Sequence, residues 1–400
     1  MTDPFVWIDT ELAAWETAGL RRRRPLRQTP QRVHCTIDGR EVVSFASNDY
    51  LALAADPRLT SAVAAVLDSL GWGSGASPLL GGWAEPHRRL EEQLACFEHV
   101  EGALVFSTGF AANASVVAAL VGPGDVVFCD AANHASLFDG CRLSRADVRV
   151  YPHNDIDRLA DLLSRSTHRR RLIVTDGLFS MDGDLAPLAA LADLARQQGA
   201  MLLVDEAHAT GVFGANGRGT LEHCGVDDPA VIRVGTLSKA LGSLGGFVVG
   251  RSKLIDYLVG RARGYVYSTA MPAAVAAAGL ASLEIIRAEP ALGRLLLQRA
   301  NRLRRTLQEQ GWNTGRSESQ IIPLIVGSPG NAMALSAALG ERGWYVPAVR
   351  PPTVPENQCR LRISATLGHS EAILDRLAAD LAELGRTIPF CDVLFRRAAE

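Results

Sequence analysis

Two polar segments in the middle of the chain each follow a short apolar run, where their side chains could do chemistry together. Asp205 ends the apolar run at 201–205, and His208 comes three residues later. Lys239 lies shortly after the apolar run at 231–234. A lysine amine can form a covalent bond to a carbonyl carbon when its pKa is lowered, and an aspartate at a buried strand end can pair with a protonated ring nitrogen.

A third segment supplies groups that suit a phosphate. Ser107, Thr108 and Gly109 follow the apolar run at 104–106 and open a helical pattern, so free N–H groups and hydroxyls are expected there. Thr236 and Ser238 add hydroxyls next to Lys239. A phosphate site, a lysine and a strand-end aspartate are what pyridoxal phosphate requires, so this cofactor is predicted.

The elements that position these groups alternate between short apolar strands and alanine-rich helical patterns. This alternation predicts an α/β fold with a mostly parallel sheet covered on both faces. Ligands of such sheets bind at the carboxyl ends of the strands, which is where the polar groups fall. The predicted strands are 104–106, 126–129, 172–176, 201–205, 231–234 and 247–250, and the predicted helices are 109–121, 155–165 and 187–199.

The pattern changes from about Ala288, and a smaller α+β domain is predicted there. Its predicted elements are a helix at 291–310, a strand at 321–327, a helix at 331–342, strands at 344–349 and 359–364, and a helix at 369–386. We therefore divide the chain into a helix and arm at 1–47, a large domain at 48–287 and a small domain at 288–400.

Composition excludes several classes of protein. The 400 residues are 48% apolar and 21% charged, with 41 Lys and Arg against 43 Asp and Glu, so the net charge is −2. This balance is typical of a globular protein and gives no reason to expect nucleic acid or an acidic membrane as partner. The seven cysteines include no Cys-x-x-Cys pair, which argues against a disulfide framework or a metal site, and we predict small, inert core residues.

The chain shows neither a targeting segment nor a membrane span. Its first residues include acids and lack an apolar core, so no signal peptide is predicted. The longest apolar stretch, 270–283, contains Pro272 and is too short to cross a bilayer. A cytoplasmic location is therefore expected.

Seven ordered segments resemble the α-oxoamine synthases, a family of fold-type-I pyridoxal-phosphate enzymes. The resemblance covers the chain from about Leu20 to its end and implies the family's seven-stranded type of sheet, its cofactor and its acyltransferase chemistry. The segments are 47–53, 107–113, 130–140, 177–184, 204–214, 236–246 and 267–272.

The resemblance also implies roles for single residues. Lys239 matches the lysine that holds the cofactor and moves a proton, and Asp205 matches the partner of its ring nitrogen. His134 matches the imidazole stacked on the ring. The remaining implied cofactor contacts are His208 and Ser180 at the phenolic oxygen, Gly109, Phe110 and Thr236 at the phosphate, and Ser268 and Thr269 at the phosphate from a second subunit of a homodimer.

On the substrate side, Arg362 matches an arginine that clamps the amino-acid carboxylate, and it follows Leu361 in an alternating strand, where a cleft or solvent would accept it. The residues matching the acyl side are Arg21, Asn48, Arg350 and Thr353. The segment 348–355 is most similar to the branch of the family that joins L-alanine to a pimeloyl thioester, carried by coenzyme A or an acyl carrier protein, in biotin synthesis.

Several alternatives stay open. The loop at 71–87 departs from the family's polar version through Pro78, Leu79, Leu80 and Trp83, which leaves the acyl group and its carrier open. The same chemistry could join glycine to acetyl- or succinyl-coenzyme A, or serine to a long acyl chain. An aminotransferase or lyase of the same fold and a non-catalytic partner subunit are further alternatives; His134 argues against the aminotransferase, and Lys239 against the non-catalytic subunit.

Overall fold

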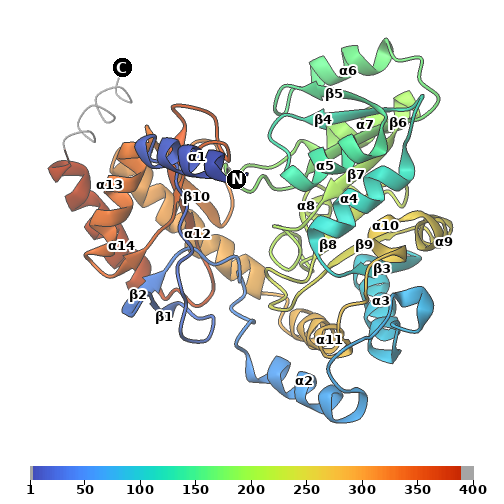
Figure 1. Ribbon diagram of the computed structural model, residues 1–400, viewed down its shortest axis with the longest axis horizontal. Helices are drawn as coiled ribbons and strands as arrows, with labels where there is room; N and C mark the ends of the chain where they lie inside the picture. The colour runs from blue at the N-terminus through green and yellow to red at the C-terminus, as the bar shows by residue number, and fades with distance from the viewer. Residues whose placement is uncertain (1–2, 389–400) are drawn as a thin grey trace. The chain divides into compact units, whose positions relative to one another are not determined.

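The computed structural model describes residues 3–388, and their contacts separate the chain into two compact units (Figure 1). Unit 2 comprises residues 48–180 and 184–297, and unit 1 comprises residues 1–47, 181–183 and 298–400. The sequence analysis instead treats 1–47 as a separate arm and places the next boundary at 287/288. Cys391, one of the seven cysteines, lies outside the described residues.

A seven-stranded sheet forms the centre of unit 2, in the order β3-β9-β8-β7-β6-β4-β5. The strands β4 to β8 run parallel, and β9 pairs antiparallel with both β3 and β8, so the prediction of a mostly parallel sheet is confirmed. The strands are β3 (Gly102–Phe106), β4 (Val126–Asp130), β5 (Asp147–Tyr151), β6 (Arg171–Asp176), β7 (Met201–Asp205), β8 (Ile232–Thr236) and β9 (Gly246–Gly250).

Helices cover both faces of this sheet. The further elements of unit 2 are α2 (Pro57–Leu70), a short 3-10 helix (Pro78–Leu80), α3 (Glu85–Glu98), α4 (Gly109–Leu120), α5 (Ala135–Ser144), α6 (Ile156–Ser164), α7 (Leu188–Gln198), α8 (Thr220–His223), α9 (Ser252–Arg261), α10 (Arg263–Val266) and α11 (Ala273–Ala288).

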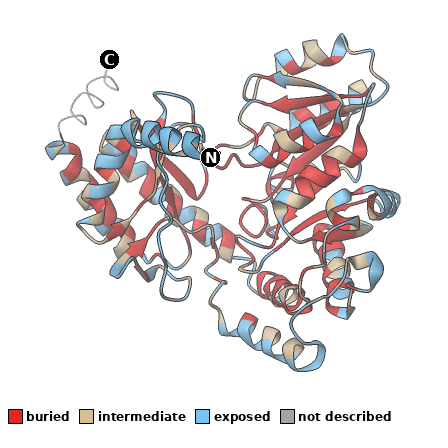
Figure 2. Ribbon diagram, viewed as in Figure 1, coloured by how far each residue is buried: buried red, intermediate tan, exposed pale blue. Residues whose placement is uncertain are grey.

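Alternate residues of each strand enter two different cores. In β4, Val127 and Cys129 belong to the core that includes residues of α4, α5, α9 and α10, whereas Val126 and Phe128 belong to the core that includes residues of α6, α7 and α8. This alternation follows from the period of two in a β-strand, and both sides are apolar because helices cover both faces. Apart from the edge strand β5, the strands of unit 2 are accordingly buried almost throughout (Figure 2).

Unit 1 has a core of its own around a three-stranded antiparallel sheet, in the order β10-β13-β12. The long helix α12 crosses the division between the units, which falls after Leu297. The elements assigned wholly or partly to unit 1 are α1 (Val6–Thr17), β1 (His34–Ile37), β2 (Arg40–Ser44), α12 (Leu292–Glu309), β10 (Ile321–Gly327), α13 (Pro329–Gly340), β11 (Trp344–Tyr345), β12 (Ala348–Val349), β13 (Cys359–Ser364) and α14 (Glu371–Thr387).

A second small sheet pairs strands from the first 47 residues with a strand from the later part of unit 1. It has the order β1-β2-β11, and the N–H of Val43 donates to the carbonyl of Gly343 at 2.8 Å. The strand expected at 344–349 is therefore two short strands in different sheets. Pro347, which has no N–H to donate, lies between β11 and β12. No helix within residues 3–388 combines the length and apolar character that crossing a bilayer would require.

Candidate active site

The polar groups predicted to act together lie at the carboxyl ends of neighbouring strands in unit 2. Asp176, Asp205 and Thr236 are the last residues of β6, β7 and β8, which are adjacent in the sheet. Asp176 and Asp205 are direct partners in the register. Parallel strands end at one edge of a sheet, so the fold places these side chains next to one another.

A cavity of about 220 Å³ collects seven of the predicted site residues. Its lining includes Lys239, His134, Asp205, His208, Gly109, Phe110 and Thr236, together with Asn113, Ser136, Asp176 and Ser238.

A larger hollow, of about 800 Å³, lies elsewhere on unit 2. Four arginines line it: Arg142, Arg145, Arg261 and Arg263. It contains none of the carboxylates, imidazoles or amines predicted to act, so chemistry rather than size identifies the site.

Lys239 lies in a tight loop between β8 and β9. Its carbonyl accepts a hydrogen bond from the N–H of Gly242 at 2.9 Å, and the N–H of Leu237 donates to Gly245 at 3.0 Å. Lys239 is half-buried, and Lys253 is the only other lysine in the sequence. The loop therefore holds one of two lysine amines of the chain at the cavity.

The start of α4 forms a close-packed turn that suits a phosphate. The hydroxyl of Thr108 caps the helix by accepting from the N–H of Ala111 at 3.0 Å. A Cβ atom on Gly109 would lie 3.3 Å from the side chain of Thr236, and one on Gly246 would lie 2.5 Å from the carbonyl of Thr108. Only glycine permits this approach, which leaves the first N–H groups of α4 at the cavity.

Both carboxylate oxygens of Asp205 have hydrogen-bond donors. Oδ1 accepts from the N–H of Ala207 at 2.8 Å, and Oδ2 accepts from Nδ2 of Asn113 at 2.6 Å. Asp205 is buried, with 6% of its surface exposed. These donors stabilise the carboxylate form, which is the form that can pair with a protonated ring nitrogen.

His208 contacts the chain that precedes α2. Its Nδ1 lies 2.6 Å from the hydroxyl of Tyr50, which is buried, and this hydroxyl lies 3.1 Å from Oδ1 of Asn48. Asn48, predicted on the acyl side, is thereby connected to the cavity through Tyr50. The tyrosine lies in the family-like segment 47–53, but the sequence analysis assigned it no role.

His134 caps α5 and is held from its backbone as well as from its ring. Its N–H donates to Oδ1 of Asp176 at 3.2 Å, and its Nδ1 accepts from the N–H of Ser136 at 3.3 Å. Burial lowers the pKa of His134, and the neighbouring Lys239 also lowers it although Asp205 opposes the shift. His134 is therefore expected to be neutral.

Asp176 is the second carboxyl group at the cavity. Its N–H donates to the side chain of Asn133 at 2.9 Å, which ties β6 to the turn after β4. Burial and the charge of Asp205 raise the pKa of Asp176 well above its ordinary value. The protonated form of Asp176 is therefore favoured at this position beside Asp205.

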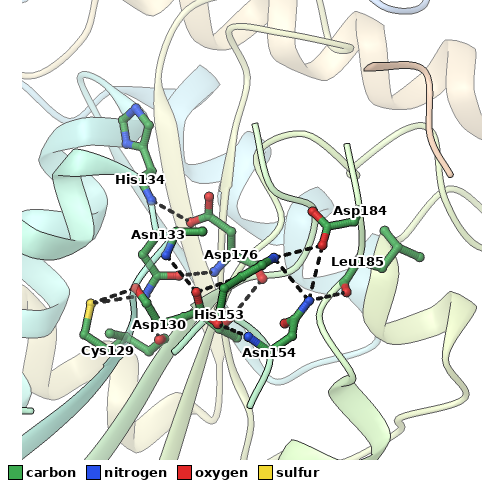
Figure 3. A network of polar contacts seen from close by, with 12 residues as sticks. Cys129, Asp130, Asn133, His134, His153, Asn154, Asp176, Asp184 and Leu185 are labelled. Atoms are coloured by element: carbon green, nitrogen blue, oxygen red, sulfur yellow. Dashed lines mark hydrogen bonds and ion pairs between the residues drawn. The ribbon is translucent and has the colours of Figure 1, made fainter. Parts of the chain in front are cut away.

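A histidine between two buried carboxylates supports the turn that carries His134 (Figure 3). Nδ1 of His153 lies 2.9 Å from Oδ1 of Asp130, and its Nε2 lies 2.8 Å from Oδ2 of Asp184. Asp130 ends β4, four residues before His134. Burial opposes the charge on His153, but the hydrogen bonds to the two carboxylates outweigh it and raise the pKa of His153 to about 10.

The other predicted site residues lie outside the cavity lining. Ser180 is buried at the end of the segment that follows β6. Ser268 and Thr269 line a small separate hollow with Ser107. Of the four that lie in unit 1, Arg362 is only 6% exposed and its Nη1 donates to Ser364 at 2.6 Å, so it does not face solvent. The other three are Arg21, Arg350 and Thr353.

The residues present fit pyridoxal phosphate. The site offers an amine, a carboxylate held by two donors, a helix start made accessible by glycines, and two imidazoles. Asn113, Ser136 and Asp176 belong to it although the sequence analysis gave them no role. Asp176 ends a strand, as Asp205 does, and this was a usable signal. Asn113 and Ser136 lie in the family-like segments 107–113 and 130–140, but neither was assigned a role there.

Comparison with known proteins agrees with this site. Residues 40–381 match the family model described as aminotransferase class I and II. An 8-amino-7-oxononanoate synthase from Anaeromyxobacter dehalogenans is 47% identical over 383 residues, which is 96% of both chains. One from Paraburkholderia xenovorans is 48% identical over 376 residues, 92% of this chain and 95% of that one.

Solved structures show the same fold. A serine palmitoyltransferase from Sphingomonas wittichii has a TM-score of 0.91 and 32% identity, with 96% of this chain and 98% of that one covered. An 8-amino-7-oxononanoate synthase from Francisella tularensis has a TM-score of 0.75 and 28% identity, with 86% and 98% covered. The chain belongs to the class I and II aminotransferase family, fold-type-I pyridoxal-phosphate enzymes, within its α-oxoamine synthase group of 8-amino-7-oxononanoate synthases and their relatives.

Proposed function

We propose that the chain joins L-alanine to a pimeloyl thioester and releases 8-amino-7-oxononanoate, CO2 and the free thiol. The observation that carries this proposal is the identity of about half of all residues with curated 8-amino-7-oxononanoate synthases over nearly the whole chain. The cavity supports it, because Lys239, Asp205, His208 and His134 meet there.

The cofactor is pyridoxal phosphate, which when bound withdraws electrons from the Cα atom of an attached amino acid. Lys239 holds the cofactor and, once released, takes the proton from Cα of alanine. Asp205 keeps the ring nitrogen protonated, and the start of α4 with Gly109, Phe110 and Thr236 binds the phosphate. His208 and Ser180 act at the phenolic oxygen.

His134 is proposed to serve the acyl transfer. A neutral imidazole whose Nδ1 accepts a hydrogen bond has its proton on Nε2. That N–H can donate to the oxygen that becomes negative when the carbon nucleophile attacks the thioester carbonyl. The carboxylate that is lost as CO2 comes from alanine, and Arg362 is proposed to clamp it before that step.

The acyl side is proposed to include Asn48, Arg21, Arg350 and Thr353. Three of these residues, Arg21, Arg350 and Thr353, lie in unit 1. Nη2 of Arg22 donates to the hydroxyl of Thr353 at 2.9 Å, and Arg350 donates to the carbonyl of Gly19. The segments that contain Arg21 and Thr353 are therefore joined directly.

A second candidate is condensation of serine with a longer acyl chain. The serine palmitoyltransferase has the higher TM-score of the two solved structures, 0.91 against 0.75. The loop at 71–87 also exposes apolar side chains, with Leu80 81% and Trp72 65% exposed. The higher sequence identity to the 8-amino-7-oxononanoate synthases favours alanine and the pimeloyl group.

We further propose that the chain acts in the cytoplasm as a homodimer. Free thiols at the six cysteines of residues 3–388 are compatible with a reducing compartment. Ser268 and Thr269 lie outside the cavity of their own chain, which agrees with a role in a second subunit. Analytical ultracentrifugation tests the dimer, and a monomer at assay concentrations would refute it.

The experiment that tests the function measures thiol release by the cofactor-loaded protein. Pimeloyl-coenzyme A and a pimeloyl carrier protein are each supplied with alanine, glycine or serine separately. We expect release with alanine and a product with the mass of the decarboxylated amino ketone. Release with serine and palmitoyl-coenzyme A instead would support the second candidate, and transfer of amino groups to a keto acid without a thioester would refute both.

A further inference from the structure

Two buried side chains form a continuous link between Asp205 and His134. Asn113, on α4, is 2% exposed, and Ser136, on α5, is fully buried. Nδ2 of Asn113 lies 2.6 Å from Oδ2 of Asp205 and 2.9 Å from Oγ of Ser136. The same Oγ lies 2.7 Å from Nδ1 of His134. Three short contacts thus join the carboxylate of Asp205 to the imidazole of His134.

The donors and acceptors of this link can be assigned in one direction. The amide of Asn113 has two hydrogens, and it donates one to Asp205 and one to Ser136. The hydroxyl of Ser136 then accepts from Asn113 and has its own hydrogen for Nδ1 of His134. Reversing the amide would place its oxygen 2.6 Å from the ionised carboxylate of Asp205, where the two oxygens would repel each other.

A second donor on Nδ1 supports the same direction. The backbone N–H of Ser136, whose hydrogen cannot rotate away, points at Nδ1 of His134 at 3.3 Å. A proton on Nδ1 would oppose this N–H. Burial lowers the pKa of His134 and keeps the ring neutral, so its one proton is on Nε2.

The orientation of the Asn113 amide has an energetic cost at its oxygen atom. Oδ1 of Asn113 is buried and has no hydrogen-bond partner among residues 3–388. Leaving a buried acceptor without a donor costs roughly 1–3 kcal/mol. A folded protein tolerates such a cost where other interactions of the same side chain compensate it. For Asn113 these are the two hydrogen bonds that Nδ2 donates.

We propose that Asn113 and Ser136 are positioning residues that fix Asp205 as a carboxylate and His134 as the tautomer with its proton on Nε2. This inference rests on the proposed function, because it supplies the donor that the acyl-transfer step uses. It assigns roles to two residues that need not touch substrate. Asn113 acts through the hydrogen bonds that it donates to Asp205 and Ser136, and Ser136 acts through the one that it donates to His134.

The first test determines the tautomer directly by NMR of the ring nitrogens in protein labelled with heavy nitrogen at histidine. His134→Gln identifies the signals of His134 by their loss. We expect an unprotonated Nδ1 and a protonated Nε2 in the wild type. A protonated Nδ1 overturns the proposal, and this measurement needs no variant of Asn113 or Ser136.

The second test compares Ser136→Ala and Asn113→Ala with a matched control. Ser144→Ala removes another buried hydroxyl of α5, whose Oγ donates to the carbonyl of Cys141 at 2.6 Å. We expect a mixture of His134 tautomers in the first two variants only. With an active wild type, kcat should fall by roughly 3- to 10-fold, as loss of one hydrogen bond implies, with KM for alanine nearly unchanged.

The outcomes separate this proposal from the proposed function. If the Nε2 tautomer persists in both variants, the link is structural only and the proposal is refuted. If the tautomers respond but the wild type releases no thiol with alanine and pimeloyl thioesters, the positioning stands and the proposed substrates are wrong.

Discussion

Replacing His153 with glutamine should destabilise the protein by several kcal/mol, and by more at low pH than at high pH. His153 is 27% exposed, whereas its partners Asp130 and Asp184 are 1% and 6% exposed. Glutamine retains hydrogen-bonding ability but carries no charge. The substitution therefore leaves two buried carboxylates without their shared cation, which is costly at low dielectric.

The size of the effect follows from the pKa of His153. The difference between the ordinary value of 6.5 and about 10 would correspond to roughly 5 kcal/mol at 1.36 kcal/mol per pKa unit. Partial exposure screens the charges, so about 3 kcal/mol is expected. A pKa raised by folding stabilises the protein fully below pH 6.5, and this contribution is lost as the pH rises through about 10.

The measurement is urea unfolding of wild type and His153→Gln at pH 6.5 or below and at about pH 10. His168→Gln is the control, because His168 lies 3.5 Å from Asp147, whose side chain is 44% exposed. We expect a large difference in free energy of unfolding at the lower pH and a small one at the higher pH. An equal difference at both pH values, or one no larger than in the control, would refute the reasoning.

Three further predictions concern the cofactor, the lysine and the core. Gly246→Ala should weaken cofactor binding at least about 10-fold, because its Cβ would displace the turn that opens α4. Gly250→Ala is the control and should not weaken binding, because its Cβ meets only the flexible side chain of Leu254. Titration of apoprotein with cofactor measures both variants. Borohydride reduction followed by mass spectrometry should place the cofactor on Lys239, and labelling should vanish in Lys239→Ala but persist in Lys253→Arg; labelling at Lys253 would contradict the assignment. Leu203→Ala should cost about 2–5 kcal/mol in urea unfolding, because Leu203 is fully buried between two sheet neighbours and α4, and Leu143→Ala, 65% exposed, should cost little.

Apolar strand runs predicted most of the sheet of unit 2, but not its edge. β6 and β7 were visible because both of their faces are buried and each carries an unbroken apolar run, 172–174 in β6 and 201–204 in β7. β5 reads Asp-Val-Arg-Val-Tyr and pairs only with β4, so charged residues interrupt its apolar residues and no apolar run is long enough to recognise. The hydrogen bonds of β5 to β4 decide its conformation.

Long-range strand pairing explains why the first 47 residues were predicted as a separate helix and arm. β2 pairs with β11, which lies about 300 residues later, and no local pattern records such a partner. The same holds for the division within α12, where one continuous helix contributes to two units. A change in pattern near Ala288 marked the helix but not where its contacts change.

The candidate site was predictable where residue type and strand end coincide. Asp205 and Lys239 combine reactive groups with such positions, and both line the cavity. Asn113 and Ser136 lie in the family-like segments 107–113 and 130–140, but their contribution was not predicted, because it depends on the approach of α4 to α5 and β7. His153 was equally hidden, since a histidine after an edge strand gains its carboxylate partners only from the end of β4 and from the loop after β6.

The paired carboxyl groups of Asp176 and Asp205 couple the stability of the chain to its cofactor. Two acids side by side at adjacent strand ends repel each other, and burial of Asp176 adds to this cost. A cationic ring nitrogen next to Asp205 offsets the repulsion, so binding and folding are thermodynamically linked and the unfolding midpoint should rise with cofactor concentration.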